Sequence, residues 1–206
     1  MTRRKRIDEL LELVTPPFVD HPYENLSLQG VADASGISMW ALRYHFGNVE
    51  RLFRAVARQL IGDVAERLSY RPEPDARVME VIAGYAAFLA ELFEDDAYRS
   101  LLYLVLRNGR RYPWLERAYE REIVTRFASP LDTLVLDASR VHGAPVLLTD
   151  GTARRLYKRL ETELALTALL PSGASTGIER EEAIRAAACQ AFSATYVFDW
   201  RVPSAA

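Results

Sequence analysis

Apolar residues recur along most of the chain at intervals of three and four positions, while glycine and proline gather between these segments. That spacing places apolar side chains on one face of a helix, and it predicts an all-α protein. The first helix is expected over about residues 3–14. Pro16 and Pro17 should end it, because neither can donate to the helical hydrogen-bond ladder.

Three further helices are expected in the N-terminal third. Ser27 is a candidate N-cap for a helix over residues 28–35, and Gly36 is the expected chain reversal after it. A short helix follows over residues 38–44, and a longer one continues from its N-cap, Asn48, to about residue 68. A short helix, a tight glycine turn and a second short helix form the layout of a helix-turn-helix, whose second helix lies in the major groove of DNA.

Residues 69–75, SYRPEPD, break the helical pattern and mark the expected boundary between a domain over residues 1–70 and a larger helical domain over residues 71–206. The second domain begins with a helix over residues 75–94 that is apolar on nearly every face, which is typical of a buried central helix. Further helices are expected over 98–107, over 114–140 with a kink at Pro130, and over 152–170 and 176–200.

Composition narrows the function. The chain has 206 residues, half of them hydrophobic, and a formal net charge of −2, which excludes a uniformly basic nucleic-acid coat. Residues 1–70 hold nine Lys or Arg and nine Asp or Glu, so DNA binding would depend on local charge placement.

The single cysteine, Cys189, favours a reducing cytoplasm. We expect neither a signal peptide nor a membrane partner, because the longest apolar run, 101–106, is too short to cross a bilayer.

An enzyme is the main rival class, and the sequence argues against it. The histidines His21, His45 and His142 lack the spacing of metal ligands, and Cys189 has no neighbouring histidine. A phosphate-binding glycine loop is also missing from the sequence. We therefore predict a non-enzyme without metal or cofactor. The remaining alternative is a helical adaptor or ligand-binding protein that has lost specific DNA binding.

The segment LSLQGVADASGISMWALRYHFGNVERLF, residues 26–53, resembles the TetR family of transcriptional regulators. The positions in register with the family pattern are Ser27, Val31, Ala32, Gly36, Ile37, Ser38, Leu42, His45, Phe46, Glu50 and Leu52. The resemblance covers about residues 6–56. It implies a helix-turn-helix domain followed by a larger effector-binding and dimerisation domain. It also implies a homodimer of repressor type that binds a palindromic double-stranded DNA operator and is released by a small, largely apolar effector.

Three positions depart from that pattern. Arg43 replaces the family's usual phosphate-contacting tyrosine, Val49 replaces a lysine, and Trp40 stands where a smaller residue is usual. Arginine can bind either a phosphate or a guanine edge, so the contact at Arg43 can persist with altered chemistry. Two alternatives stay open nearby: Trp40 can cover the domain core instead of touching DNA, and His45 can either orient the turn by hydrogen bonding or contact a phosphate.

The DNA-binding candidates lie on the helix-turn-helix or in a basic N-terminal arm, which can equally be a disordered terminus. They are Arg3, Arg4, Lys5, Ser27, Gln29, Ser38, Met39, Trp40, Ala41, Arg43, Tyr44, His45 and Asn48.

The resemblance further implies an effector pocket in the second domain, for which the candidates are mostly aromatic residues that can equally be plain core. They are Tyr85, Phe88, Leu92, Tyr103, Leu106, Arg107, Arg110, Tyr112, Trp114 and Phe127. Arg107 and Arg110 can anchor an acidic ligand or remain solvated at a helix end. The last two helices either complete the core or form half of a dimeric four-helix bundle, which we favour. The dimer-interface candidates are Leu156, Leu160, Leu164, Ile184, Ala187, Ala188, Ala191 and Phe192.

Overall fold

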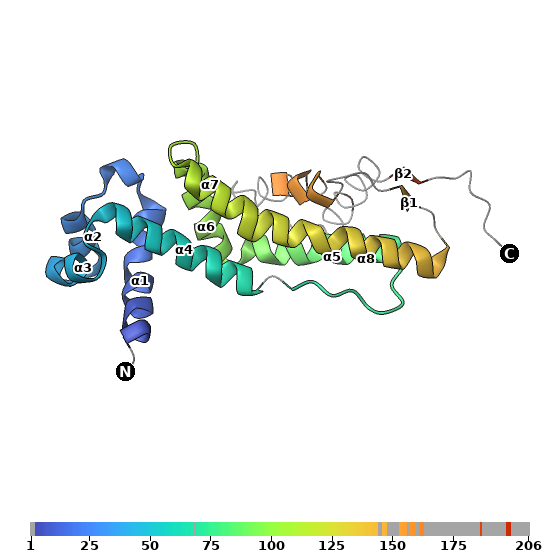
Figure 1. Ribbon diagram of the computed structural model, residues 1–206, viewed down its shortest axis with the longest axis horizontal. Coiled ribbons are helices and arrows are strands. Elements are labelled where there is room, and N and C mark those ends of the chain that lie inside the picture. Colours follow the sequence, from blue (N-terminus) through green and yellow to red (C-terminus); the bar gives the residue numbers. More distant parts are fainter. Residues whose placement is uncertain are drawn as a thin grey trace. The chain divides into compact units, whose positions relative to one another are not determined.

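The computed structural model describes residues 3–67, 69–143, 146–147, 153–155, 157–159, 161–162, 186 and 197–198. Helices account for most of these residues, which confirms the predicted all-α class (Figure 1). The elements are α1 (Arg3–Asp20), the 3-10 turn η1 (Tyr23–Asn25), α2 (Leu28–Ser35), α3 (Met39–Phe46), α4 (Val49–Arg67), α5 (Val78–Glu94), α6 (Asp96–Asn108), α7 (Pro113–Tyr119), the π-helical turn η2 (Glu120–Thr125), α8 (Arg126–His142), β1 (Val146–Leu147) and β2 (Val197–Phe198).

The helices group into two compact units that do not follow the chain in simple order. Residues 1–67 and 96–123 form the first unit, and residues 68–95 and 124–206 form the second. The sequence predicted a single division near residue 70. In the structure α6 and α7 belong to the first unit, because α6 packs on α1 and α4, and α7 packs on α4 and α6.

The first helix corrects one prediction from the sequence. α1 continues through Pro16 and Pro17 to Asp20, instead of ending near residue 14. A proline inside a helix costs about 3 kcal/mol, because it removes a hydrogen bond and crowds the preceding turn. Here the carbonyls that lose their helical donors belong to Glu12 and Leu13, both exposed residues, so water can replace the missing bonds. Burial of the apolar face on either side of the prolines offsets the rest of the cost.

The helix-turn-helix forms where the sequence predicts it, because each boundary signal makes its expected contact. The Ser27 hydroxyl accepts a hydrogen bond from the Gly30 amide at 3.0 Å, and the Asn48 carboxamide accepts one from the Arg51 amide at 2.9 Å. Gly36 turns the chain between α2 and α3 with a φ of 65°, in the left-handed region that favours glycine. α1 packs on α2 and α4, and α3 packs on α2 and α4. Val14, Val31, Leu42 and Leu52, one from each of these helices, are fully buried.

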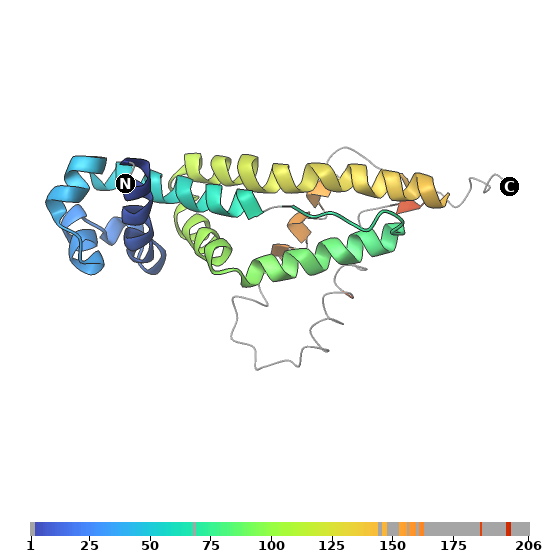
Figure 2. The same cartoon turned by 90° about the horizontal axis from the view of Figure 1, so that it is seen from below.

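In the second unit α5 and α8 run side by side (Figure 2). The segment before α5 is fixed to it by Tyr70, whose hydroxyl donates to the Val81 carbonyl at 2.8 Å. A Cβ at Gly84 would collide with that hydroxyl, so glycine permits the close approach. The expected kink at Pro130 is displaced: the regular helix is interrupted at η2, and Pro130 lies inside α8.

The far C-terminal sequence is described at few positions. β1 and β2 pair antiparallel, with Val146 opposite Phe198 and Leu147 opposite Val197. This short ladder corrects the prediction of a helix running to residue 200, because the backbone groups of Val197 and Phe198 bond across to another segment. Across the described residues, none of the helices has the length and apolar content needed to span a membrane.

Two glycine substitutions should change stability in opposite directions. Gly36→Ala places a side chain in the left-handed region, where nothing contacts it, so we expect a loss of about 1–2 kcal/mol in the free energy of unfolding. Gly62 lies inside α4 with open space around it, so Gly62→Ala should raise that free energy by about 0.5–1 kcal/mol. Urea unfolding at one protein concentration measures both. Shifts in the same direction would contradict the geometry at Gly36.

Candidate nucleic-acid interface

Helix α3 has a buried face and an exposed face, and both follow from its eight-residue sequence. Leu42 and Phe46 lie four residues apart and are buried against the first unit. Trp40, Arg43 and Tyr44 have the i, i+3 and i+4 spacing that brings side chains together on a helix surface, and all three are exposed. The helix therefore presents one continuous outward surface made of two aromatic rings and a guanidinium group.

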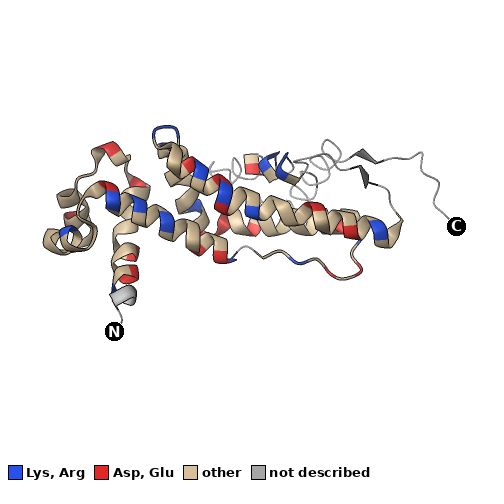
Figure 3. Ribbon diagram, viewed as in Figure 1, with Lys and Arg blue, Asp and Glu red and all other residues tan. Residues whose placement is uncertain are grey.

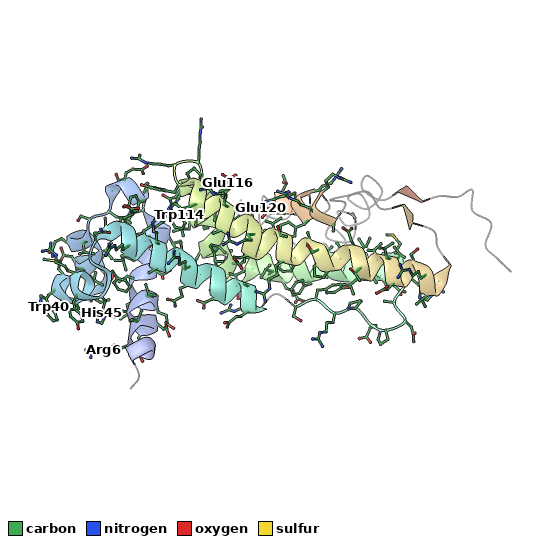
Figure 4. All side chains as sticks on the ribbon, viewed as in Figure 1. Arg6, Trp40, His45, Trp114, Glu116 and Glu120 are labelled. Carbon is green, nitrogen blue, oxygen red and sulfur yellow. The ribbon has the colours of Figure 1, made fainter. Side chains whose placement is uncertain are left out.

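The two aromatic side chains of that surface stack on each other. Trp40 and Tyr44 have ring centroids 5.4 Å apart and an angle of 12° between their planes. They retain 72% and 67% of their accessible surface, so neither covers the core. Figure 4 shows Trp40 and His45 projecting outward from α3. The alternative that Trp40 caps the domain core is therefore wrong for this structure.

Charge on α3 is confined to its second half. The helix contains no acidic residue, and its basic residues are Arg43 and His45. Figure 3 shows the lysine and arginine positions of the described chain in blue and the aspartate and glutamate positions in red. Within the part of the chain that the structure describes, Arg43 forms no ion pair, so its guanidinium is available to an external acceptor. His45 is half-buried and contacts the rings of Tyr44 and Phe46, at 5.0 and 6.2 Å between centroids. Those contacts position His45 by ring packing.

Several other predicted contact residues already have local structural partners. Ser38 caps α3 by accepting from the Ala41 amide at 3.2 Å, as Ser27 caps α2. The Gln29 amide donates to the Asp33 carboxylate at 2.7 Å along α2. Met39 is half-buried at the start of α3. These residues shape the two short helices, and the caps leave the hydroxyl protons of both serines free to donate outward.

Arg51 was missed by the sequence reasoning. It lies in the first turn of α4, and a Cβ at Gly47 would be 3.6 Å from one of its guanidinium nitrogens. An exposed cation therefore stands at the turn between α3 and α4, where Val49 lacks the family's lysine. Its position two residues after Val49 was the available signal, but only the folded turn shows that its side chain leans back toward Gly47.

The basic N-terminal residues belong to a helix. Arg3, Arg4 and Lys5 form the first residues of α1, so the alternative of a disordered terminus is wrong for residues 3–20. Arg6, on the next position of α1, is exposed. α1 has no acidic residue in its first turn, so its basic start is not neutralised within that turn.

The predicted effector-binding residues divide between the two units. Tyr103, Leu106, Arg107, Arg110, Tyr112 and Trp114 lie in the first unit. Tyr112 and Trp114 pack on Phe53 of α4, with centroids 5.6 and 5.7 Å from its ring. Arg107 donates to the Val19 carbonyl at the end of α1, which accounts for it without an acidic ligand. The connection between α6 and α7 therefore belongs to the packing around the helix-turn-helix.

The other candidates gather in the second unit. Phe88 lies between Tyr70 and Phe127, with centroids 5.9 and 5.6 Å away, and Phe127 stacks on Tyr157 at 5.7 Å. Burial raises the pKa of the Tyr70 hydroxyl, which keeps it neutral and donating. Leu92 is buried on the same helix as Phe88.

The second unit also holds an open cavity that none of the ten candidates lines. It has a volume of about 340 Å³ between the segment before α5 and the last turns of α8. Pro72, Pro74, Leu134 and Val141 are among its apolar lining residues.

The dimer-interface candidates Leu156, Leu160, Leu164, Ile184, Ala187, Ala188, Ala191 and Phe192 all lie outside the described residues.

We compared the chain with protein families, curated proteins and solved structures. No protein-family model matches the chain. Over 107 residues the chain is 38% identical to the HTH-type transcriptional repressor AcnR of Corynebacterium efficiens, a match covering 52% of this chain and 44% of that repressor. The chain thus spans less than half the length of this curated relative.

Solved structures match over nearly the whole chain. A TetR family transcriptional regulator from Pseudomonas syringae pv. tomato is 20% identical, with a TM-score of 0.63 over 95% of this chain and 98% of that one. The flavonoid-responsive regulator FrrA is 19% identical, with a TM-score of 0.64 over 92% and 96%. At these identities the structural likeness defines the fold. The chain therefore has the fold of the TetR family of transcriptional regulators, which confirms the resemblance seen in its helix-turn-helix segment.

Proposed function

We propose that this protein is a transcriptional regulator of repressor type that binds a palindromic DNA operator as a homodimer in the cytoplasm. The observation that carries the proposal is the outward face of α3, where Trp40, Arg43 and Tyr44 are exposed together while Leu42 and Phe46 hold the helix to its unit. In a helix-turn-helix this second helix enters the major groove, with its N-terminal residues at the base edges. Similarity to the curated repressor supports the same function.

Local charge supports DNA binding in spite of the neutral total. Arg43 and Arg51 are exposed on either side of the turn between α3 and α4, and the first four residues of α1 are basic. Phosphates accept hydrogen bonds from arginine and from the exposed amides at helix starts. Arg51 is proposed to supply the phosphate contact that Val49 cannot.

The contacts of α6 and α7 suggest how an effector could release DNA. The Arg111 side chain pairs with Glu24 at 2.7 Å, and Arg107 donates to the Val19 carbonyl. Arg54 of α4 lies over the Trp114 ring at 4.8 Å from its centroid. A shift of α6 or α7 would therefore move α1, which packs on α2, and α4, which packs on α3. We propose this as the coupling route.

The effector is proposed to be small and largely apolar, bound at the aromatic cluster of Tyr70, Tyr85, Phe88, Phe127 and Tyr157 in the second unit. Flat aromatic ligands pack well against such rings. The solved neighbour FrrA is a flavonoid-responsive regulator, which makes a flavonoid a reasonable first probe.

Selection from random double-stranded DNA at low salt should enrich an inverted repeat. Two copies of α3 related by a two-fold axis would enter successive major grooves about 34–36 Å apart, so the half-sites should be centred one helical turn apart. A single unrepeated motif would contradict the homodimer. An unenriched pool would overturn the regulator and favour the adaptor that has lost specific DNA binding.

Arg43→Ala should weaken operator binding without unfolding the protein, because the exposed side chain contributes little to the core. A bidentate contact to guanine predicts a loss of about 1–3 kcal/mol and relaxed preference at one base pair. A phosphate contact predicts a similar loss on every sequence and a salt dependence reduced by about one unit. Fluorescence anisotropy over a salt series separates the two, and Arg140→Ala on α8 is the matched control. Unchanged affinity at every salt concentration would remove Arg43 from the interface.

Quercetin, as a flavonoid probe, should raise the melting temperature and lower operator affinity, since a ligand bound to the native state stabilises it. Phe88→Ala should remove most of the thermal shift, because Phe88 contacts two rings of the cluster. Differential scanning fluorimetry and operator titration provide the two readouts. Thermal stabilisation of equal size in Phe88→Ala would place the binding site elsewhere.

A further inference from the structure

The exposed face of α3 is unusually apolar for a surface that meets DNA. Of its outward side chains, Arg43 alone carries a permanent charge, and the other two exposed large side chains are the Trp40 and Tyr44 rings. Trp40 contacts only Tyr44 among the ring pairs formed by described residues. Large apolar side chains left in water and held together in this way are typical of a binding surface.

The stack is also ordered before any partner arrives. The residues lie four apart on a helix, so their Cα positions are fixed by the backbone, and the near-parallel rings restrict each other's rotation. His45 packs edge-on against Tyr44, with 84° between the ring planes, and supports the pair from the side. Little side-chain entropy remains to be lost when this surface is covered.

Major-groove chemistry offers one apolar group that matches this surface. The C5 methyl group of thymine projects into the groove, and no other unmodified base presents a methyl there. The hydrogen-bonding side chains within α3 are Arg43, His45, the Tyr44 hydroxyl and the Trp40 indole N–H, and the helix has no asparagine, glutamine, aspartate or glutamate. Two ring faces are suited to apolar contact with methyl groups.

We infer that Trp40 and Tyr44 read thymine methyl groups, so that each half-site of the operator contains thymines facing this aromatic pair. The inference rests on the proposed DNA-binding function and adds the base class that this site selects. Successive base pairs rise 3.4 Å along the duplex, so rings 5.4 Å apart span between one and two steps. The thymines should therefore lie within three consecutive base pairs of each half-site.

Replacement of thymine by deoxyuridine tests the inference, because it removes the methyl group and preserves base pairing. The operator selected by the wild-type protein is synthesised with each half-site thymine replaced in turn, symmetrically in both half-sites. Transfer of one methyl group out of water corresponds to about a fourfold change in affinity, so a double replacement should weaken binding about fifteenfold. We expect this loss at one or two positions within a three-base-pair window.

Variants of the protein connect that loss to the two rings. Trp40→Ala and Tyr44→Ala should bind the unmodified operator more weakly and should lose their sensitivity to deoxyuridine at the corresponding position. Trp40→Phe should retain part of the operator affinity and part of the sensitivity to deoxyuridine, because an aromatic ring remains at this position. Met79→Ala, which removes an exposed apolar side chain from α5, is the matched control and should keep the wild-type sensitivity. Circular dichroism confirms that each variant is folded.

The outcomes separate the inference from the function beneath it. Unchanged wild-type affinity for every deoxyuridine operator overturns the inference and leaves operator binding intact. Deoxyuridine sensitivity that persists in both alanine variants also overturns it, because another residue then reads the methyl groups. If Trp40→Ala binds the unmodified operator as tightly as the wild-type protein does, the inference is overturned, and the exposed rings bind a partner other than DNA. Failure to enrich any operator overturns the proposed function, and the inference with it.

Discussion

The proposed DNA-binding surface depends on the burial of one side of an eight-residue helix. A helix as short as α3 is unstable alone, because the cost of nucleation is spread over very few hydrogen bonds. Leu42 and Phe46 supply the missing stability by inserting into the first unit, and the Ser38 hydroxyl satisfies a free amide at the helix start. Once those two anchors fix the rotation of α3, the outward position of Trp40, Arg43 and Tyr44 follows from helical geometry.

The first unit also contains a second set of contacts, which join α4 to α1, η1 and the start of α7. Phe53 of α4 is fully buried, and its ring lies near Phe18, Tyr23, Tyr112 and Trp114. Those rings come from α1, η1 and the start of α7. α7, which packs on α4, thus comes from sequence far beyond the helix-turn-helix, and its contacts belong to the coupling route proposed above.

The two proposed binding events, of DNA and of an effector, require different surfaces. The proposed DNA recognition uses exposed side chains, namely two rings that stack on each other and the guanidinium group of Arg43. Effector recognition is proposed to use rings that already pack on one another, around Phe88 and Phe127. A ligand there would have to replace existing ring contacts, so its affinity depends on how closely it reproduces them.

The sequence by itself determined the local elements around residue 36. Ser27, Gly36, Ser38 and Asn48 signal boundaries through bonds that reach only three or four residues, so the bounds of the helix-turn-helix could be predicted closely. The exposure of Trp40 stayed open until the structure showed it.

Tertiary structure decided the features that depend on distant partners. α1 continues through Pro16 and Pro17 because burial in the first unit outweighs local propensity. Tyr112 and Trp114 pack on Phe53 in place of a ligand, and Arg51 leans back toward Gly47. Helical periodicity shows that a side chain is apolar and which face it occupies, but the element that covers that face is set by packing across the chain, which no local pattern contains.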